Sequence, residues 1–580
     1  MFELSDKKKE LLNTRGPLLI TGGPGSGKTT IALLKAKQII EQEGLKQRQQ
    51  VLFLSFARAT VSRVEEQVGQ MISAETRKYI EVNTYHGYIW GLLKSHGYLL
   101  NNRFPLKLLT PPEAASRFAN INDTKERERE KYRIFYAEGV VHFDLFAQLG
   151  AELLSRSNAL TKIICDSYPV VILDEFQDTN ADEWKFIQQL GKRSVLIALA
   201  DAEQRIYEFR GADPARISEF LKEYNPKHFD FGSENNRSNG TDITMFGNDL
   251  LTGHNKGKKY SNVHVVGYPY RQGVWNHFDV KVSAIKAARR LFNSEHKKNW
   301  SVAVLVPTKK LMMEVSDYFS GMQVLSSTQQ LRSIPHEVAL ETAGPSLAAI
   351  LFGGLLDLGP DKQVTLKQLI SNLSEHIRGR KGDKSPSKEN LALSGALLKY
   401  RDTGEIRGSK RQAIIKECSA IVDLLCGTQY SGNPSEDWMK IVEVMSKYSS
   451  DVIRQVVVDS KYLRILHKGS ELRSSLSNLW RSHGSYLGAA QAIRSSLLQE
   501  YFSSSAKVYK GIHVMTIHKS KGKEFDEVII YEGRFQDRIV ISGGNTRSLE
   551  QSRLSLRVGV TRARYNATIL TPASDVCPFL

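Results

Sequence analysis

The stretch that decides the fold is PLLITGGPGSGKTTIALLKAKQII, which spans residues 17–40. A short apolar run leads into a glycine-rich loop, and the loop leads into a segment with the apolar spacing of an amphipathic helix. The spacing Gly-x4-Gly-Lys-Thr, from Gly22 to Thr29, is that of a P-loop. In such a loop, backbone N–H groups surround phosphate oxygens at a helix N-terminus, the lysine neutralises phosphate charge and the threonine hydroxyl binds Mg²⁺.

The sequence therefore predicts a site for a nucleoside triphosphate. The alternative is a chance glycine-rich turn, which the strand and helix patterns on either side of the loop disfavour. The residues expected to contact the nucleotide are Gly22, Gly23, Pro24, Gly25, Ser26, Gly27, Lys28, Thr29 and Thr30.

Two further apolar runs predict buried strands, at residues 51–54 and 170–173. Short apolar strands separated by helical patterns indicate a parallel α/β sheet, whose carboxyl edge carries the ligands. The second run ends in Asp174 and Glu175, which would then face the phosphates. Asp174 is expected to bind Mg²⁺ together with Thr29, and Glu175 to accept a proton from the attacking water. Acidic residues after a strand are often merely solvated, but the P-loop upstream favours the functional interpretation.

Composition limits the class of protein. A chain of 580 residues predicts about four domains, and 41% apolar with 24% charged residues is ordinary globular usage. The net charge of +18 favours a polyanionic partner such as nucleic acid, although many basic proteins merely carry solvated lysines. Four scattered cysteines, a charged N-terminus and a longest apolar stretch of residues 347–356 predict a cytoplasmic protein without a membrane partner.

Five further motifs carry a family resemblance. They are DEFQDTN from residue 174, DAEQRIYEFRGAD from 201, NNRS from 235, MTIHKSKGKEF from 515 and RVGVTRAR from 557. In sequence, order and spacing the chain resembles the UvrD/Rep-like superfamily 1 DNA helicases. The resemblance implies an α/β fold of two RecA-like motor domains with parallel sheets, each carrying a mainly helical insertion. It also implies ATP and Mg²⁺ as cofactors and 3′-to-5′ stepping on single-stranded DNA.

The resemblance gives roles to further residues at the nucleotide. Gln204 matches the γ-phosphate sensor, and Arg237 and Arg562 match the arginine fingers that stabilise charge in the transition state. Glu524 matches a glutamate that contacts the nucleotide. With Lys28, Asp174 and Glu175, these residues make up the expected catalytic set.

Other matched positions belong to the family's DNA-binding face, where bases stack on aromatic side chains without sequence preference. Taken singly, an aromatic residue is more often part of the core, and a lone histidine is more often structural. The expected DNA contacts are Phe56, His86, Tyr207, Phe209, Arg210, Thr516 and His518.

Two departures affect recognition of the base. Lys8 aligns with the glutamine that contacts the adenine edge in the family, and Asn236 stands where a tyrosine normally stacks on adenine. A lysine ammonium only donates, and an asparagine offers no aromatic face. We therefore predict a relaxed base preference. SFARA in place of the usual motif Ia, and Arg557 before VGVTRA, make the DNA contacts and packing there less predictable.

The resemblance also predicts four domains. They are 1A at residues 1–88 and 160–237, 1B at 89–159, 2A at 238–344 and 507–580, and 2B at 345–506. Within them, EREREKYR from residue 126 predicts a helix with a solvated face, and HIRGRKGDKSPSKEN from 376 predicts an exposed loop rather than a dedicated duplex contact. We expect no fused nuclease, because few residues follow Arg562.

Together these features predict an ATP-dependent translocase or helicase that moves 3′ to 5′ on single-stranded DNA and unwinds tailed duplexes, in DNA repair or anti-phage defence. The alternative is a DNA-sensing NTPase subunit that regulates a partner, such as a nuclease encoded nearby, without productive unwinding. A binding protein with an inactive P-loop is disfavoured, because the catalytic lysine, carboxylates and both arginines are present.

Overall fold

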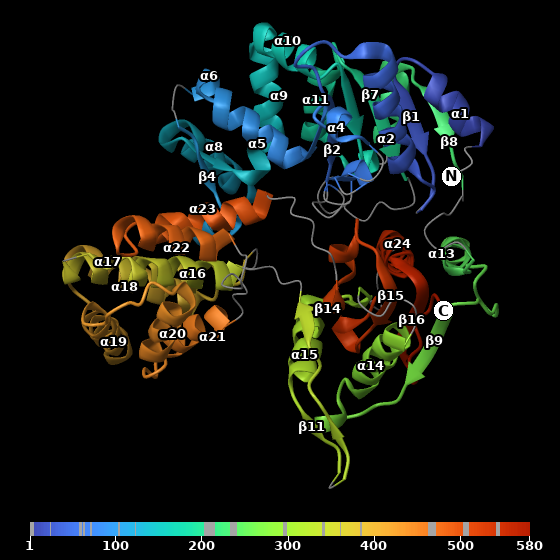
Figure 1. Cartoon of the computed structure of the whole chain (residues 1–580). Coiled ribbons are helices and arrows are strands. Elements are labelled where there is room, and N and C mark those ends of the chain that lie inside the picture. The colour runs from blue at the N-terminus through green and yellow to red at the C-terminus, as the bar shows by residue number, and fades with distance from the viewer. Residues whose placement is uncertain are drawn as a thin grey trace. The chain divides into compact units, whose positions relative to one another are not determined.

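The computed structural model divides into two compact units (Figure 1). The first unit comprises Met1–Ile89, Gly150–Leu340 and Ser504–Leu580, and the second comprises Trp90–Leu149 and Glu341–Ser503. The finer division into four domains stays a prediction. The structure describes residues 5–23, 25–56, 61, 64–65, 67–69, 72–101, 105–121, 123–201, 215–232, 240–293, 299–326, 328–338, 343–359, 361–382, 386–461, 471–502, 510–540 and 546–580.

The first lobe of the first unit is built on a six-stranded sheet in the order β3-β2-β6-β7-β1-β8. Every pairing in it is parallel. The apolar run before the P-loop and the predicted strands at residues 51–54 and 170–173 all lie in this sheet, where their apolar side chains are buried. Its strands are β1 (Leu18–Thr21), β2 (Val51–Ser55), β3 (Ile80–Thr84), β6 (Val170–Leu173), β7 (Val195–Ala200) and β8 (Lys227–Asp230).

Helices connect these strands, as parallel pairing requires. A capping box in which Asn180 and Glu183 each bond to the other's backbone N–H starts α11, directly after the DEFQDT segment. The helical segments of this lobe are α1 (Asp6–Asn13), α2 (Lys28–Gln38), η1 (Ile39–Gly44), α4 (Ala74–Arg77), α5 (Tyr85–His96), α9 (Phe146–Arg156), α10 (Asn158–Ser167), η3 (Phe176–Asp178), α11 (Ala181–Gly191) and α12 (Arg216–Tyr224); α5 and α9 continue into the second unit.

The second lobe of the first unit holds another six-stranded parallel sheet, in the order β13-β14-β10-β15-β16-β9. Helices α14 and α15 pack in one hydrophobic cluster with it, and α13 and α24 pack in another. Both lobes are thus α/β layers around a parallel sheet, as predicted. The strands are β9 (Val263–Tyr268), β10 (Ser301–Val306), β13 (His336–Val338), β14 (Gly511–Thr516), β15 (Phe525–Tyr531) and β16 (Ala563–Pro572), with a small antiparallel pair, β11 (Gln323–Val324) and β12 (Gln330–Leu331). The helical segments are α13 (Ile243–Thr252), η6 (Gly273–Trp275), α14 (Phe278–Asn293), α15 (Lys309–Ser320), η8 (Ile517–Ser520), η9 (Phe535–Asp537) and α24 (Thr546–Val560).

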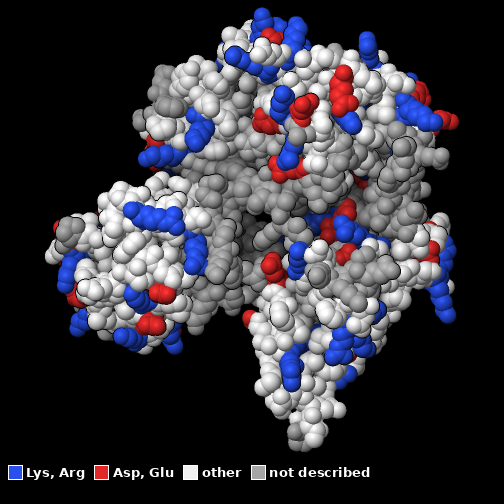
Figure 2. All heavy atoms as spheres, in the orientation of Figure 1, with Lys and Arg blue, Asp and Glu red and all other residues white. Residues whose placement is uncertain are grey.

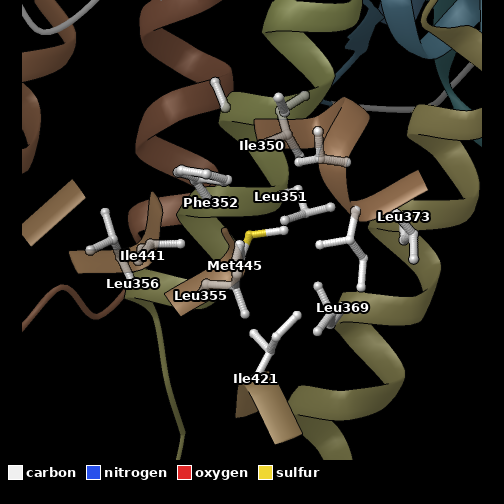
Figure 3. Close-up of a cluster of buried hydrophobic side chains, with 14 of the residues drawn as sticks. Ile350, Leu351, Phe352, Leu355, Leu356, Leu369, Leu373, Ile421, Ile441 and Met445 are labelled. Atoms are coloured by element: carbon white, nitrogen blue, oxygen red, sulfur yellow. The ribbon is translucent and has the colours of Figure 1, made fainter. Parts of the chain in front are cut away.

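The second unit is mainly helical and has its own core (Figure 3). Helix α16 (Ala343–Leu356) is apolar around its whole circumference, and its side chains from Leu347 to Phe352 are each at most 1% exposed. The longest apolar stretch of the sequence is thus the centre of a protein core. Within the described residues, no helix is both long and apolar enough to cross a membrane. The other elements are α6 (Tyr98–Asn101), β4 (Lys107–Leu109), α7 (Pro111–Arg117), α8 (Thr124–Glu138), β5 (Val140–His142), η2 (Phe143–Leu145), α17 (Lys362–Gly379), α18 (Lys388–Thr403), α19 (Ser409–Cys426), α20 (Pro434–Met445), α21 (Asp451–Lys461), α22 (Glu471–His483) and α23 (Ala489–Phe502).

The expectation of an exposed loop over residues 376–390 is wrong at both ends, since α18 already begins at Lys388. Helix α17 continues to Gly379, and His376 is 1% exposed with Nε2 2.9 Å from Oδ2 of Asp459. The apolar spacing of Leu373 and Ile377 continues the helix through a stretch whose composition suggested a loop. The predicted charged helix is present as α8, but its Lys131 is buried between Glu128 and Asp144 rather than solvated.

Candidate nucleotide and DNA site

The P-loop follows β1 and is held to the first sheet by backbone hydrogen bonds. The N–H of Gly22 donates to the carbonyl of Ala200, and that of Gly23 donates to the carbonyl of Gly232 at 2.9 Å. A Cβ atom at Gly22 would lie 2.8 Å from Ser26 Oγ and 3.1 Å from the Cβ of Phe231, so the loop packs closely at this residue. Gly27 has φ +86° and turns the chain into α2, the left-handed conformation that glycine adopts without strain.

The loop has the features that a phosphate group requires. Lys28 begins α2, so Thr29 and Thr30 lie in its first turn, where backbone N–H groups have no intrahelical partner. Among the described residues, the hydroxyl of Ser26 is buried without a hydrogen-bond partner. The Lys28 ammonium donates to the carbonyl oxygens of Gly22 and Gly23, at 2.6 and 3.0 Å, and thus lies over the loop. These groups fit a triphosphate; Pro24 lies outside the described residues.

The two carboxylates after β6 are held by different partners. Ser55, at the end of the neighbouring strand β2, donates from Oγ to Asp174 Oδ2 at 3.0 Å. Gln177 donates from Nε2 to Glu175 Oε2 at 2.6 Å and accepts from the N–H of Asp201. Glu175 has φ +54°, a conformation that side-chain-bearing residues seldom adopt and that recurs at functional sites. The carboxylate of Glu175 is therefore fixed in position by its surroundings.

Lys521 is a site residue that sequence reasoning missed. It comes from the second lobe, is 4% exposed, lies with Nζ 3.8 Å from Glu175 Oε2 and donates a hydrogen bond to Asp178. It belongs to the MTIHKSKGKEF motif, which contains three lysines at alternate positions, 519, 521 and 523. No local signal in the sequence distinguishes the buried lysine from its two neighbours.

Burial and neighbouring charges shift the pKa values of Glu175 and Asp178 in opposite directions. Burial opposes ionisation of Glu175, but the charges of Lys521, Lys28 and Arg562 outweigh it and hold its pKa below the usual range. Burial raises the pKa of Asp178, and the neighbouring Glu175 charge adds to the effect against the attraction of Lys521. Glu175 is therefore the carboxylate that remains ionised, which is the form a proton acceptor needs.

The arginines of the RVGVTRAR motif are buried. Arg562 is 2% exposed, donates from Nε to the carbonyl of Val558 and is close enough to Glu175 for its charge to lower that pKa. Arg557, which departs from the family pattern, is 1% exposed and extends from the second lobe to within 4.0 Å of Asp201 in the first. Glu524 accepts a hydrogen bond from Arg564 at 3.3 Å. Gln204 and Arg237 lie outside the described residues.

Comparison with known proteins identifies the family. The model of the UvrD/REP helicase N-terminal domain matches residues 4–138 and 107–225, and that of the UvrD-like helicase C-terminal domain matches residues 437–572. The chain belongs to the UvrD/Rep-like superfamily 1 helicases.

The relatives of this UvrD/Rep-like helicase match it along nearly its whole length. It is 22% identical to "Putative ATP-dependent DNA helicase YjcD" of Bacillus subtilis (strain 168), over 98% of this chain and 79% of that protein. It is 21% identical to "DNA helicase II" of Escherichia coli (strain K12), over 98% of this chain and 84% of that protein. It is also 21% identical to "ATP-dependent DNA helicase Rep" of the same strain, over 95% and 88%.

The predicted DNA contacts of the UvrD/Rep-like helicase lie near the carboxyl ends of strands. Phe56 follows β2 and stacks on the buried Tyr85, with ring centroids 4.4 Å apart, so one of its faces packs against the protein. His86 lies 4.0 Å from Glu183. Thr516 ends β14, and burial lowers the pKa of the nearby His518, which keeps it neutral. Tyr207, Phe209 and Arg210 lie outside the described residues.

Lys8, which aligns with the family's adenine-reading glutamine, lies in α1. Its ammonium is 5.2 Å from the centroid of the Phe231 ring. Phe231 in turn packs against the P-loop, because a Cβ atom added at Gly22 would lie 3.1 Å from the Cβ of Phe231. Lys8, which lies against the Phe231 ring, is therefore beside the P-loop. Its partner in the base-selectivity argument, Asn236, lies outside the described residues.

Proposed function

We propose that this helicase uses ATP hydrolysis to move 3′ to 5′ along single-stranded DNA and to separate the strands of tailed duplexes. The observation that carries the proposal is the contact of Lys521 with Glu175 and Asp178. Lys521 lies five residues beyond Thr516, in the same segment as two expected DNA contacts. A strand held by this segment would thereby act on the position and charge of the catalytic carboxylate.

Different residues of the site bind the phosphates, bind Mg²⁺ and activate the attacking water. The P-loop N–H groups and Lys28 bind phosphate oxygens, and Thr29 and Asp174 would hold Mg²⁺, which neutralises charge on the phosphates when it is bound. Glu175 accepts the proton of the attacking water, and Arg562 supplies positive charge from the second lobe. Gln204 and Arg237 would complete the set. Because the groups come from two lobes, we expect hydrolysis to depend on a strand that aligns them.

The net charge of the chain and the family to which it belongs both favour DNA as the binding partner. The net charge of +18 attracts a polyanion, and on the face shown in Figure 2 the basic side chains of the described residues are spread over the surface with acidic ones among them. We propose single-stranded and tailed duplex DNA as partners, in the cytoplasm, with a role in repair or anti-phage defence.

A strand-displacement assay tests the proposal. Duplexes with a 3′ tail, a 5′ tail or no tail are incubated with ATP and Mg²⁺, and release of the labelled strand is followed. We expect release from the 3′-tailed duplex, and none from any duplex with the Glu175→Gln variant as the matched control.

Two results would contradict it. Preference for the 5′ tail would overturn the direction. DNA-stimulated hydrolysis without release from any duplex would favour the regulatory NTPase, and the assay would then be repeated with neighbouring gene products, including any nuclease.

A further inference from the structure

An aromatic pocket lies in the second lobe, outside the site described above. Its volume is about 150 Å³, and it opens where β9 and β15 end and where α14 and α15 begin. Its walls include Tyr268, Tyr270, Trp275, Tyr531 and Phe535. In open parallel sheets, ligands bind at the carboxyl ends of the strands, and the pocket lies at this edge.

One wall of the pocket is held in an unusual conformation. Phe535 has φ +53°, which a bulky residue rarely adopts, and its side chain is 90% exposed. The turn that carries it is closed by the N–H of Gly533, which donates to the carbonyl of Asp537 at 2.7 Å, and by the Thr308 hydroxyl, which donates to the Asp537 carboxylate. The fold thus holds an aromatic ring in solvent instead of burying it.

Two arginines lie against the aromatic rings. The guanidinium of Arg534 is 3.9 Å from the centroid of the Tyr270 ring, and Tyr270 is itself 61% exposed. Arg271 lies 5.4 Å from the Trp275 centroid and forms an ion pair with Asp279 at 3.2 Å. Alternating aromatic and arginine side chains are the groups on which unpaired bases stack.

Charged side chains of both signs line the pocket beside the aromatic rings. The carboxylates of Asp279, Glu314 and Asp537 outnumber the guanidinium groups of Arg271 and Arg534, so the lining has no excess of positive charge to hold a phosphate group. Lys310, 76% exposed on its side chain, is within 4 Å of both Glu314 and Asp537 and lies outside the lining. The volume matches cavities that hold a benzene-sized ring. The interior therefore fits the flat ring of a base.

The pocket continues the edge that carries the expected DNA contacts. In the second sheet, Thr516 is paired with Val306, the last residue of β10. Thr308 follows two residues later and is the group that bonds to Asp537 at the pocket. The predicted DNA contact Thr516 and the pocket therefore lie at the same edge of the sheet, and the turn after β10 connects them.

We propose that this pocket takes an unpaired nucleobase of the bound DNA strand, which stacks against Phe535 and Tyr270. The inference rests on the proposed function, since it names a further contact of the same strand. Stacking on an aromatic ring tolerates any base, so the pocket would hold the strand without reading its sequence.

Abasic scanning tests the pocket. Thymidine oligonucleotides that lack one base at each position in turn are titrated against the full chain at fixed salt, with fluorescence anisotropy as the readout. One abasic position should weaken binding to the wild-type protein by about five- to hundredfold through loss of the stack at the pocket. Phe535→Ala should bind the intact strand more weakly and should no longer respond to that position. Tyr270→Ala should behave in the same way.

The matched control is Phe292→Ala, which removes another exposed phenylalanine of the same lobe, 59% exposed and outside the pocket, and should keep the wild-type profile. Strands with one 4-thiothymidine should also photo-crosslink to residues 268–279 or 531–537. An unchanged abasic profile in both pocket variants, with crosslinks only elsewhere, would overturn the pocket alone. A wild-type protein that binds no single strand would contradict the proposed function as well.

Discussion

The ammonium nitrogen of Lys521 lies 3.8 Å from Oε2 of Glu175 and joins the two lobes at the residue expected to activate water. A buried cation at this position favours the ionised form of the carboxylate. Lys521→Met should therefore raise the pKa of Glu175 and move the acidic limb of the kcat/KM profile for ATP hydrolysis to higher pH, with a lower rate at neutral pH. Lys521→Arg, which keeps the charge, should restore the limb toward its original position. An unmoved profile in Lys521→Met would contradict the role.

Two substitutions separate binding from hydrolysis. Lys28→Ala should lose nucleotide binding, because the ammonium that lies over the P-loop is removed. Glu175→Gln should bind ATP and lower turnover by roughly 10²- to 10⁴-fold, because the amide cannot accept a proton. Equilibrium binding of a fluorescent ATP analogue and steady-state hydrolysis with single-stranded DNA measure the two effects. Full activity in Glu175→Gln would show that another group is the base.

Coupling to DNA should depend on Phe209. If this residue stacks on a base, Phe209→Ala should lose about 1–3 kcal/mol of DNA binding and reduce translocation more than basal ATP hydrolysis. Phosphate contacts should make log K fall by roughly 0.7 per neutralised phosphate for each tenfold rise in salt. Anisotropy titrations at several salt concentrations test both. A DNA-binding constant that does not change with salt concentration would contradict the phosphate contacts. Unfolding of the Phe209→Ala variant would contradict the stacking role of Phe209.

Base preference should be relaxed, because Lys8 beside the P-loop cannot accept a hydrogen bond from the adenine amino group. The phosphate and arginine contacts do not depend on the base. With saturating single-stranded DNA, we expect GTP, CTP and UTP to be hydrolysed within about an order of magnitude of ATP, a difference of about 1.4 kcal/mol. Lys8→Gln should increase the preference for ATP. A hundredfold preference in the wild-type protein would show that other residues recognise adenine.

Acid should destabilise the second lobe through His277. Burial lowers the pKa of His277 to about 4, against about 6.5 in an unfolded chain. The unfolded chain binds more protons between these values, so the stabilisation is complete above pH 6.5 and is lost as the pH falls toward 4. At pH 5 the free energy of unfolding is lower by about 2 kcal/mol than at neutral pH. His277→Asn, which tolerates the φ of +57° at this position, should show a smaller drop in thermal midpoint between pH 7.5 and pH 5. An equal drop would exclude this residue as the cause.

Local spacing made the nucleotide site predictable, and distant contacts determined the rest. The P-loop and the carboxylates after β6 are recognisable because loop, strand and helix signals are adjacent in the sequence. Lys521 is one of three alternating lysines, and only folding buries it beside Glu175. His376 carried a helical signal that the composition of its neighbours obscured. The aromatic pocket combines segments more than 250 residues apart along the chain, which no local pattern can reveal.

The chain passes between the two compact units four times, after Ile89, Leu149, Leu340 and Ser503. Each unit is therefore assembled from separate lengths of the polypeptide, and neither can be produced from one uninterrupted gene fragment. Synthesis must also proceed through β16 before the second sheet is complete, since β16 lies between β15 and β9. During translation, the strand β9 leaves the ribosome some 300 residues before its sheet neighbour. Premature termination would thus leave a protein with an intact P-loop and no partner lobe to complete its active site.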